Sequence, residues 1–412
     1  MADGNVFERI SKRIDSYEGD MVDLQIALTA IPALAPENGG NGEYKKSRYL
    51  MERLAPLGFN NIRTFDAPDD RVIFNCRPNI VATIPGKDRG RTVWIITHMD
   101  VVPPGEAGLW DHDPYKGYVK EGRIYGRGTE DNHQDLVASI FAAKAFADEG
   151  IQPGLSVGLA FVADEETSSS KGLVYLLGIK KKLFKKNDII VVPDFGNKEG
   201  SMIEVAEKSL LWLRFKTVGI QCHASEPSLG RNAFVAASHL VTKLGDLYRI
   251  FDKVDPLYSP PTSTFEPTRK DANVPNINTI PGDDVFYLDC RILPDYDLVE
   301  VMSRIRAMAD EVEQAFDVSI DIVTIQAVNA PPPTDKDAPV VKALASAVRE
   351  VYGVDALPGG IGGGTVAAHL REKGYPAAVW SRLGMMAHQP NENCLISNMI
   401  GNAKVFARLF LG

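Results

Sequence analysis

The peptide TVWIITHMD, residues 92–100, gives the first indication of the architecture. Its apolar run Val93–Ile96 shows no polar alternation, which is typical of a strand buried on both faces of a parallel sheet. The run ends in His98 and Asp100, and two prolines stop the strand shortly afterwards. These two side chains therefore follow the carboxyl end of a buried strand, which is where open α/β sheets bind ligands.

Strands and helices alternate on both sides of this peptide. The spacing of apolar residues from Phe7 to Leu28 predicts an amphipathic helix, and a further helix is expected at His133–Glu149. Apolar strands are predicted at Asn79–Ile84, Leu155–Val162 and Asp188–Val192. This order favours an α/β fold with a mostly parallel sheet flanked by helices.

The pattern changes near residue 208. The elements expected there run strand, helix, strand, strand, helix, strand, at 210–218, 232–251, 276–281, 285–293, 296–316 and 318–325. This β-α-β-β-α-β order is the ferredoxin-like unit, after which helices and strands resume. We therefore predict an α/β domain in two parts, 1–208 and 329–412, interrupted by an inserted α+β domain at 209–328.

Composition excludes several classes of function. The chain of 412 residues has 54 acidic and 45 basic side chains, and its net charge of −9 argues against nucleic acid as a partner. Its four cysteines form no C-x-x-C pair, so reduced thiols are expected. The sequence shows neither the apolar core of a signal peptide nor a run of about 20 apolar residues, so we predict a cytoplasmic protein without membrane association.

Metal-type side chains recur at the predicted strand ends. Besides His98 they are Asp131 in GRGTEDNH, Glu165 and Glu166 in ADEET, Asp194 in VVPDF and His388 in SRLGMMAHQPNE. Two imidazoles and several carboxylates on one sheet edge suit a pair of divalent ions that share a bridging carboxylate. Without cations the acids would repel one another strongly. The alternative is a polar loop cluster.

The doublet Glu165-Glu166 indicates hydrolysis. Neighbouring residues just past a strand end can point different ways, so one carboxylate can bind metal while the other faces the reacting water. A carboxylate beside metal-bound water is the expected general base.

Five short motifs occur in the order of a known family. They are HMDVVP at 98–103, GRGTED at 126–131, DEE at 164–166, PD at 193–194 and AHQPNE at 387–392. The chain resembles the two-zinc peptidases and amidohydrolases, which include carboxypeptidase G, acetylornithine deacetylase, succinyl-diaminopimelate desuccinylase, aminoacylase, peptidase T and the carnosinase-like dipeptidases. The resemblance implies a zinc-peptidase catalytic domain with an inserted lid and dimerisation domain, and a homodimer formed through that domain.

The resemblance also implies a role for each residue of the metal site. Two divalent ions are expected, zinc first, with cobalt or manganese as alternatives. The ligands would be His98 and Asp194 for the first ion, Glu166 and His388 for the second, and Asp131 bridging both. Asp100 would orient the His98 ring, Glu165 would be the general base, and the peptide bond after Asp131 is expected to be cis.

Further residues are implied in substrate binding. His223, in GIQCHASEP, would contact the oxyanion, in relatives often across a subunit boundary. Asn278 and Arg291 would hold the substrate carboxylate, helped by backbone N–H groups of Gly363, Gly364 and Thr365. The alternatives are a turn contact for His223, an internal salt bridge for Arg291, and relief of backbone strain by the glycines.

The chain departs from the family pattern at two places. Asn132, His133 and Gln134 follow the bridging aspartate, where many relatives have a second acid or a Met-Lys-Gly run. At position 194 many deacylases and carboxypeptidases have glutamate. With Asp194 the chain resembles the dipeptidase and aminopeptidase branch of the family at this position.

These observations predict a co-catalytic metallohydrolase. It would cleave the amide bond of a small peptide with a free carboxylate, through a metal-bridging hydroxide activated by Glu165. A deacylase for N-acyl amino acids, of the acetylornithine or succinyl-diaminopimelate type, is the alternative with the same chemistry. The alternative from another class is a metal-binding or regulatory protein without catalysis. The sequence leaves the substrate side chain and the native metal open.

Overall fold

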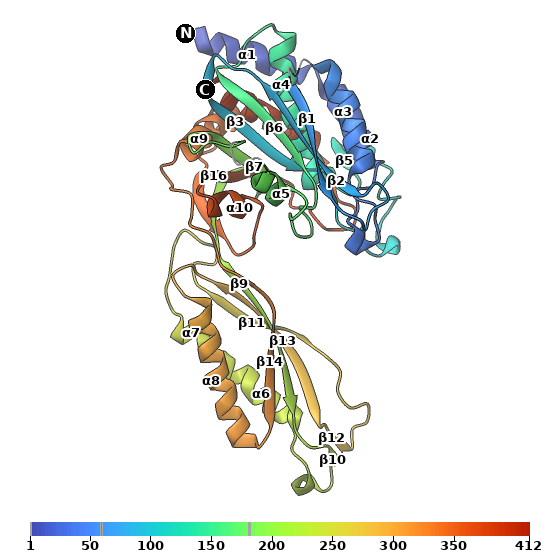
Figure 1. Ribbon diagram of the computed structural model, residues 1–412, viewed down its shortest axis with the longest axis vertical. Helices are drawn as coiled ribbons and strands as arrows, with labels where there is room; N and C mark the ends of the chain where they lie inside the picture. Colours follow the sequence, from blue (N-terminus) through green and yellow to red (C-terminus); the bar gives the residue numbers. More distant parts are fainter. Residues whose placement is uncertain (1, 58, 60, 180–182) are drawn as a thin grey trace. The chain divides into compact units, whose positions relative to one another are not determined.

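The computed structural model describes residues 2–57, 59, 61–179 and 183–412 (Figure 1). The chain divides into two compact units. Unit 1 comprises Met1–Val205, Pro333–Pro358 and Thr365–Gly412, and unit 2 comprises Ala206–Pro332 and Gly359–Gly364. Unit 2 thus interrupts the sequence of unit 1 twice, as the long segment Ala206–Pro332 and as the short segment Gly359–Gly364.

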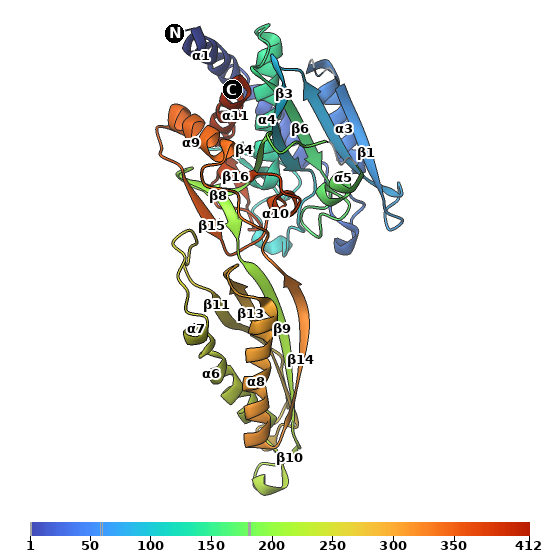
Figure 2. The same ribbon diagram turned by 60° about the vertical axis from the view of Figure 1, so that its left-hand side comes forward.

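Unit 1 contains a sheet of eight strands in the order β1-β2-β6-β3-β7-β16-β8-β15. The strands in this order are Asn61–Pro68, Cys76–Ile84, Leu155–Val162, Asp88–His98, Ile189–Asn197, Ala377–Arg382, Met202–Glu207 and Leu357–Ile361. The central strands β6, β3, β7 and β16 are parallel, whereas β2 and β8 pair with them in the antiparallel sense. The expected α/β fold with a mostly parallel sheet is confirmed, and Figures 1 and 2 show its central strands side by side.

Helices cover both faces of this sheet. On one face α11 packs against α4 and α9, and α1 and α2 contact α4. On the other face α5 and α10 bury Trp94 and Val192. The bounds are α1 Ala2–Asp15, α2 Glu18–Thr29, α3 Tyr44–Leu54, α4 Gln134–Asp148, α5 Leu173–Ile179, α9 Pro339–Tyr352, α10 Ala367–Glu372 and α11 Ile396–Leu411. Two apolar faces of the sheet explain why its central strands lack polar alternation.

A small sheet in unit 1 ties two distant loops together. It has the order β17-β5-β4, with β4 at Tyr118–Lys120, β5 at Arg123–Tyr125 and β17 at Asn393–Leu395. Asn393 pairs with Tyr125, so the segment that begins at Gly126 lies beside the segment that ends at Glu392.

Unit 2 has the expected ferredoxin-like order. Its elements are β9 Ser209–Val218, α6 Ala233–Leu244, α7 Leu247–Ile250, β11 Thr264–Lys270, β13 Asp283–Ile292, α8 Leu298–Phe316 and β14 Ser319–Val328. The antiparallel sheet has the order β11-β13-β9-β14. Alternate residues of β9, among them Leu211, Leu213 and Phe215, are buried in one core with α6 and α8.

One predicted strand of unit 2 is misplaced. Of the segment 276–281 only β12, Thr279–Ile280, is extended, and it pairs with β10, Cys222–His223, in a separate ribbon. The second strand of the main sheet is instead β11. Its exposed, charged sequence includes Pro267, where the register shifts, and a proline is tolerated because β11 lies at the sheet edge.

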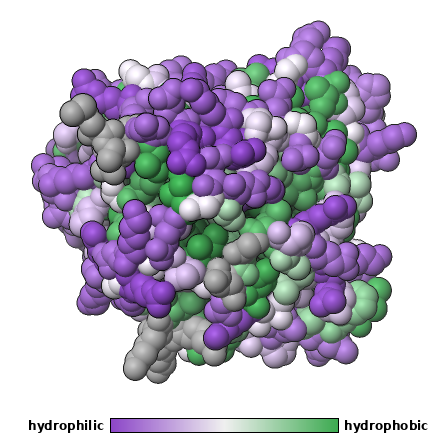
Figure 3. Space-filling view, turned by 90° about the horizontal axis from the view of Figure 1, so that it is seen from above, coloured by the Kyte–Doolittle hydropathy of each residue, from purple (hydrophilic) through white to green (hydrophobic). Residues whose placement is uncertain are grey.

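The surface is largely polar. The face in Figure 3 shows hydrophilic residues over most of its area, with hydrophobic residues gathered in the centre. Within the residues that the structure describes, every helix is too short or too polar to cross a bilayer. All four cysteines are free thiols.

Candidate metal centre

The five predicted metal ligands converge in unit 1. His98 ends β3, Asp131 lies in the turn before α4, Glu166 follows β6, and His388 lies in the loop after β16. Asp194 lies within β7, where pairing with β16 jumps from Val192–Val379 to Gly196–Ser381. This break in the strand pairing lets the Asp194 side chain turn toward the other four predicted ligands.

Their ligand atoms form two groups that share one residue. His98, Asp131 and Asp194 make one group, and Asp131, Glu166 and His388 make the other, with the atoms of each group within 4.8 Å of one another. His98 Nε2 lies 2.8 Å from Asp131 Oδ1, and His388 Nε2 lies 3.2 Å from Asp131 Oδ2. Each carboxylate oxygen of Asp131 thus faces a different imidazole, as a bridging ligand requires. The peptide bond from Asp131 to Asn132 is cis, as the resemblance implies.

Asp100 connects His98 to the glutamate doublet. We assign the His98 Nδ1–H as a donor to the backbone oxygen of Asp100, 3.1 Å away, while the nearer carboxylate oxygen lies at 3.6 Å. Nε2 then faces the cluster, where it donates to Asp131 while the ring is protonated and would offer its lone pair to a bound ion. The Asp100 carboxylate accepts hydrogen bonds from the backbone N–H groups of Glu165, at 3.1 Å, and Glu166, at 3.0 Å. Asp100 therefore contacts both parts of the site, His98 through its backbone oxygen and the glutamate doublet through its carboxylate.

The histidines carry the compensating charge in this arrangement. Burial disfavours the His98 imidazolium, but the carboxylates of Asp194, Asp100 and Asp131 outweigh it and raise the pKa of His98 well above its usual value. Hydrogen bonds to Asp131 and Glu166 raise the pKa of His388 to about 10. Burial opposes ionisation of Asp131, yet hydrogen bonds from both histidines lower its pKa. The site thus attracts positive charge strongly, which fits divalent cations.

The glutamate doublet supports the same conclusion. Burial, followed by the charge of Asp131, raises the pKa of Glu166 to about 7. Its Oε1 atom is buried and lacks a hydrogen-bond partner among the described residues, so it is available as an ion ligand. Burial and the charge of Asp194 raise the pKa of Glu165 well above its usual value, and the charges of His98, Glu166 and Asp131 also act on it. A carboxylate so placed suits proton transfer.

Sequence reasoning missed several side chains that hold the ligand loops. Glu392 accepts hydrogen bonds from the backbone N–H groups of Gly128, Glu130 and Asp131 at 2.9 to 3.0 Å, and pairs with Arg127. Glu392 is the acid at the end of the motif AHQPNE. It was not predicted because it binds backbone N–H groups and not a metal ion.

A second missed group lies behind the glutamate doublet. The buried guanidinium of Arg77 forms an ion pair with Glu43 and lies 3.5 Å from Asp164 and 3.7 Å from Asp69. Glu43 Oε1 also accepts the Asp164 N–H at 3.2 Å. Asp164 has a left-handed φ of 61°, which this network holds in place.

His133 has a structural explanation in this fold. Its Nε2 atom lies 2.7 Å from Nζ of Lys46, and both side chains are fully buried. Burial, together with the positive charge of Lys46, lowers the pKa of His133 well below its usual value. The neutral imidazole therefore accepts a hydrogen bond from Lys46 and adds no positive charge to the site.

The predicted substrate-binding residues fall into two places in unit 2. His223 and Asn278 lie together at the β10–β12 ribbon, where Ala224 N–H donates to Asn278 O at 2.9 Å and His223 Nδ1 lies 2.7 Å from Ser225 Oγ.

Arg291 lies elsewhere in unit 2, on β13. It makes a two-pronged ion pair with Asp289, at 2.6 and 2.9 Å, and its Nη1 donates to Gly362 O at 2.8 Å. It therefore adjoins the glycine run with Gly363 and Gly364, while Thr365 begins the following segment of unit 1. The internal salt bridge considered for Arg291 is present, and its role toward substrate stays a prediction.

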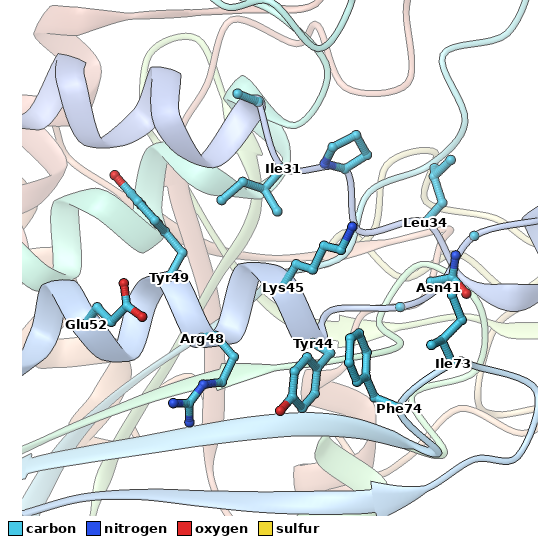
Figure 4. Close-up of a pocket in the computed structure, with 14 residues that line it drawn as sticks. Ile31, Leu34, Asn41, Tyr44, Lys45, Arg48, Tyr49, Glu52, Ile73 and Phe74 are labelled. Atoms are coloured by element: carbon cyan, nitrogen blue, oxygen red, sulfur yellow. The ribbon is translucent and has the colours of Figure 1, made fainter.

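A cavity of about 720 Å³ lies away from these ligands (Figure 4). It is bounded by the loop after α2, by α3 and by the turn before β2. Tyr44 and Phe74 stack at one side, with ring centroids 3.9 Å apart, and Lys45 extends from α3 toward the loop after α2. We place the functional centre by the chemistry of its side chains rather than by cavity size.

Comparison with known proteins gives a consistent result. The sequence profile of "Peptidase family M20/M25/M40" matches residues 94–412. An uncharacterized metallohydrolase of Methanococcus maripaludis is 43% identical over 94% of this chain and 97% of its own. A succinyl-diaminopimelate desuccinylase of Paracoccus denitrificans is 28% identical over 81% of this chain and 85% of its own. The human carnosine dipeptidase 1 structure shares the fold, with a TM-score of 0.71, 19% identity, and 98% and 99% of the two chains covered.

Proposed function

The chain belongs to peptidase family M20/M25/M40, and on that premise we propose that it cleaves an amide bond in a small peptide with a free carboxylate, using two metal ions. As a member of this family it is a hydrolase of amide or peptide bonds, and its relatives include metallohydrolases. The finer assignment is supported chiefly by one observation, the two ligand groups that share Asp131.

The donor set fits two ions. Each group offers one imidazole nitrogen and carboxylate oxygens, a combination that suits zinc, cobalt or manganese. We propose zinc as the native metal, with His98 and Asp194 on one ion, Glu166 and His388 on the other, and Asp131 on both. Bound ions would polarise the scissile carbonyl and acidify a water molecule.

The chain's own residues then move the proton. Glu165 accepts a proton from the attacking water as the new C–O bond forms at the carbonyl carbon. It donates that proton to the leaving nitrogen as the C–N bond breaks, so the carboxylate is regenerated. The hydrogen bond from Glu165 N–H to Asp100 fixes the backbone from which this side chain projects. His223 would stabilise the oxyanion as a hydrogen-bond donor.

We propose Arg291 as the site for a substrate carboxylate. Asn278 lies in another part of unit 2, at the β10–β12 ribbon, and its role toward that carboxylate stays a prediction. Three of the five N–H donors of Arg291 point to Asp289 and Gly362, which leaves two for a carboxylate. The bond to Gly362 also brings the guanidinium beside Gly363 and Gly364, whose N–H groups would assist, together with that of Thr365.

A deacylase for N-acyl amino acids is the second candidate. It requires the same chemistry, and the similarity to succinyl-diaminopimelate desuccinylases favours it. The two candidates differ in the acyl side of the bond, an amino acid in one and an acetyl or succinyl group in the other.

The test combines one variant with one substrate panel. Wild type and Glu165→Gln are assayed on dipeptides and on N-acetyl and N-succinyl amino acids, with metal content measured by elemental analysis. We expect Glu165→Gln to keep both ions and to lose about 100- to 10,000-fold in kcat. Glu18→Gln, at an exposed position on α2, is the matched control and should keep wild-type turnover. Near-full activity of Glu165→Gln would refute its role as base, and two bound ions without hydrolysis of any amide would favour a non-catalytic protein.

We further propose a homodimer formed through unit 2. The strand β14 lies at a sheet edge and exposes Ile325 and Val328, which are 53% and 50% exposed. Unpaired edges with apolar side chains favour association with another copy. Light scattering coupled to size exclusion should give twice the chain mass at micromolar concentration, and a monomer would contradict the proposal.

A further inference from the structure

Glu130 is a buried acid that the catalytic scheme does not use. It immediately precedes Asp131, and 1% of its surface is exposed. Its carboxylate points across to the loop after β16. There Oε2 accepts the Gly384 N–H at 2.5 Å, and Oε1 accepts the N–H of Met386. A Cβ atom on residue 384 would lie 2.8 Å from Oε2, so this approach depends on glycine.

The loop that Glu130 holds carries His388. Met385 and His388 have left-handed φ values of 66° and 62°, a region that side-chain-bearing residues avoid. His388 is also 56% exposed, so core packing does not fix its ring. Neither packing nor regular secondary structure therefore fixes this loop. The hydrogen bonds from its backbone to the buried carboxylate of Glu130 do so instead.

The support is reciprocal. Glu392, at the far end of the same loop, accepts N–H groups from Gly128, Glu130 and Asp131. Each of the two loops therefore contributes one carboxylate that binds the backbone of the other. Asp131 and His388, the ligands that the loops present, belong to the same predicted ion group.

We propose that Glu130 is a positioning residue that sets His388 at the ion site shared by Asp131, Glu166 and His388. The inference rests on the proposed pair of ions. It predicts that loss of Glu130 weakens that site selectively and leaves the site of His98, Asp131 and Asp194 near its wild-type affinity.

The experiment is a titration with Zn²⁺ in competition with a chromophoric chelator. Wild type should bind two ions. Glu130→Ala should keep one tight site and lose about 10- to 100-fold in affinity at the other. Glu130→Gln should be intermediate, because an amide has one accepting oxygen for the two N–H groups.

Two further variants separate positioning from general stability. Asp188→Asn removes a buried carboxylate that accepts backbone N–H groups of Thr92 and Lys185 and the indole of Trp94, and it should keep both affinities. The double variant Glu130→Ala with His388→Ala should bind Zn²⁺ no more weakly than His388→Ala alone, because Glu130 affects Zn²⁺ affinity only by positioning His388.

The outcomes are distinct. Two unchanged affinities in folded Glu130→Ala would overturn the inference, and so would equal weakening of both sites or additive losses in the double variant. If Glu130→Ala fails to fold by circular dichroism, Glu130→Gln decides by the same criteria. A wild-type protein that binds fewer than two ions would overturn the proposed function itself and this inference with it.

Discussion

Replacing Arg77 by methionine should destabilise unit 1 severely. The guanidinium is fully buried, pairs with Glu43 and lies within 3.7 Å of Asp69 and Asp164. Methionine fills a comparable volume but leaves Glu43 without its cation. It also takes a positive charge away from Asp164 and from Asp69, although Asp69 keeps its ion pair with Arg71 at 2.7 Å. Removal of one partner from a buried ion pair costs about 3–5 kcal/mol, and we expect a loss of that size in the free energy of unfolding.

The loss should grow with pH. Burial raises the pKa of Glu43, and the hydrogen bonds and charge of Arg77 oppose that rise. In Arg77→Met the opposition is gone, so the pKa of folded Glu43 rises further above its unfolded value of about 4.3. The folded variant then binds more protons than the unfolded chain, and its stability falls as pH rises. The deficit relative to wild type should therefore be larger at pH 8 than at pH 5.5.

The assay is urea unfolding of the full chain at the two pH values, followed by far-UV circular dichroism. Arg91→Met is the matched control, because Arg91 forms an exposed pair with Asp88 at 3.1 Å and should change stability by less than about 0.5 kcal/mol. A loss below about 1 kcal/mol for Arg77→Met would refute the reasoning. A deficit that shrinks between pH 5.5 and pH 8 would refute its electrostatic part.

Three further changes have definite expected results. Gly158→Ala places a methyl group 2.3 Å from Cε3 of Trp94 and should cost about 1–3 kcal/mol in urea unfolding, whereas Gly178→Ala, with open space around it, should not destabilise the chain. Asp100→Asn leaves an amide whose single oxygen cannot take the place of both carboxylate oxygens that accept the N–H groups of Glu165 and Glu166. Titration with Zn²⁺ against a chelator should show about 10- to 100-fold weaker binding, and wild-type affinity would contradict this. Removal of metal by a chelator should lower the unfolding midpoint, since each ion at 100 times its Kd adds about 2.7 kcal/mol, and coincident midpoints would argue against bound ions.

The sequence predicted those elements whose apolar pattern is unambiguous. Leu155–Val162 forms β6 with the expected bounds, and the buried run before His98 forms the end of β3. The apolar residues from Phe7 to Leu28 lie in two helices and not in the one helix that was predicted. The chain turns at Ser16 and Tyr17, where the Tyr17 hydroxyl donates a hydrogen bond to Asp148 at 2.6 Å.

Strands without that pattern were not predicted. The polar strand β1 and the edge strand β11 gain their conformation from a neighbouring strand, which leaves little trace in local sequence. The site shows the same division. Side chains that resemble ligands could be found by type and spacing, whereas Glu130 and Glu392 act on backbone groups hundreds of residues away.

The position of β16 has a consequence for biosynthesis. Strands β7 and β8 are neighbours in sequence, yet β16 lies between them in the sheet. A ribosome must therefore release residue 382 before the middle of the sheet can close, by which time the contiguous segment of unit 2 has already emerged. Until then the edge of β7 that pairs with β16 has no partner, so we expect chains truncated before residue 377 to aggregate more readily than the full chain.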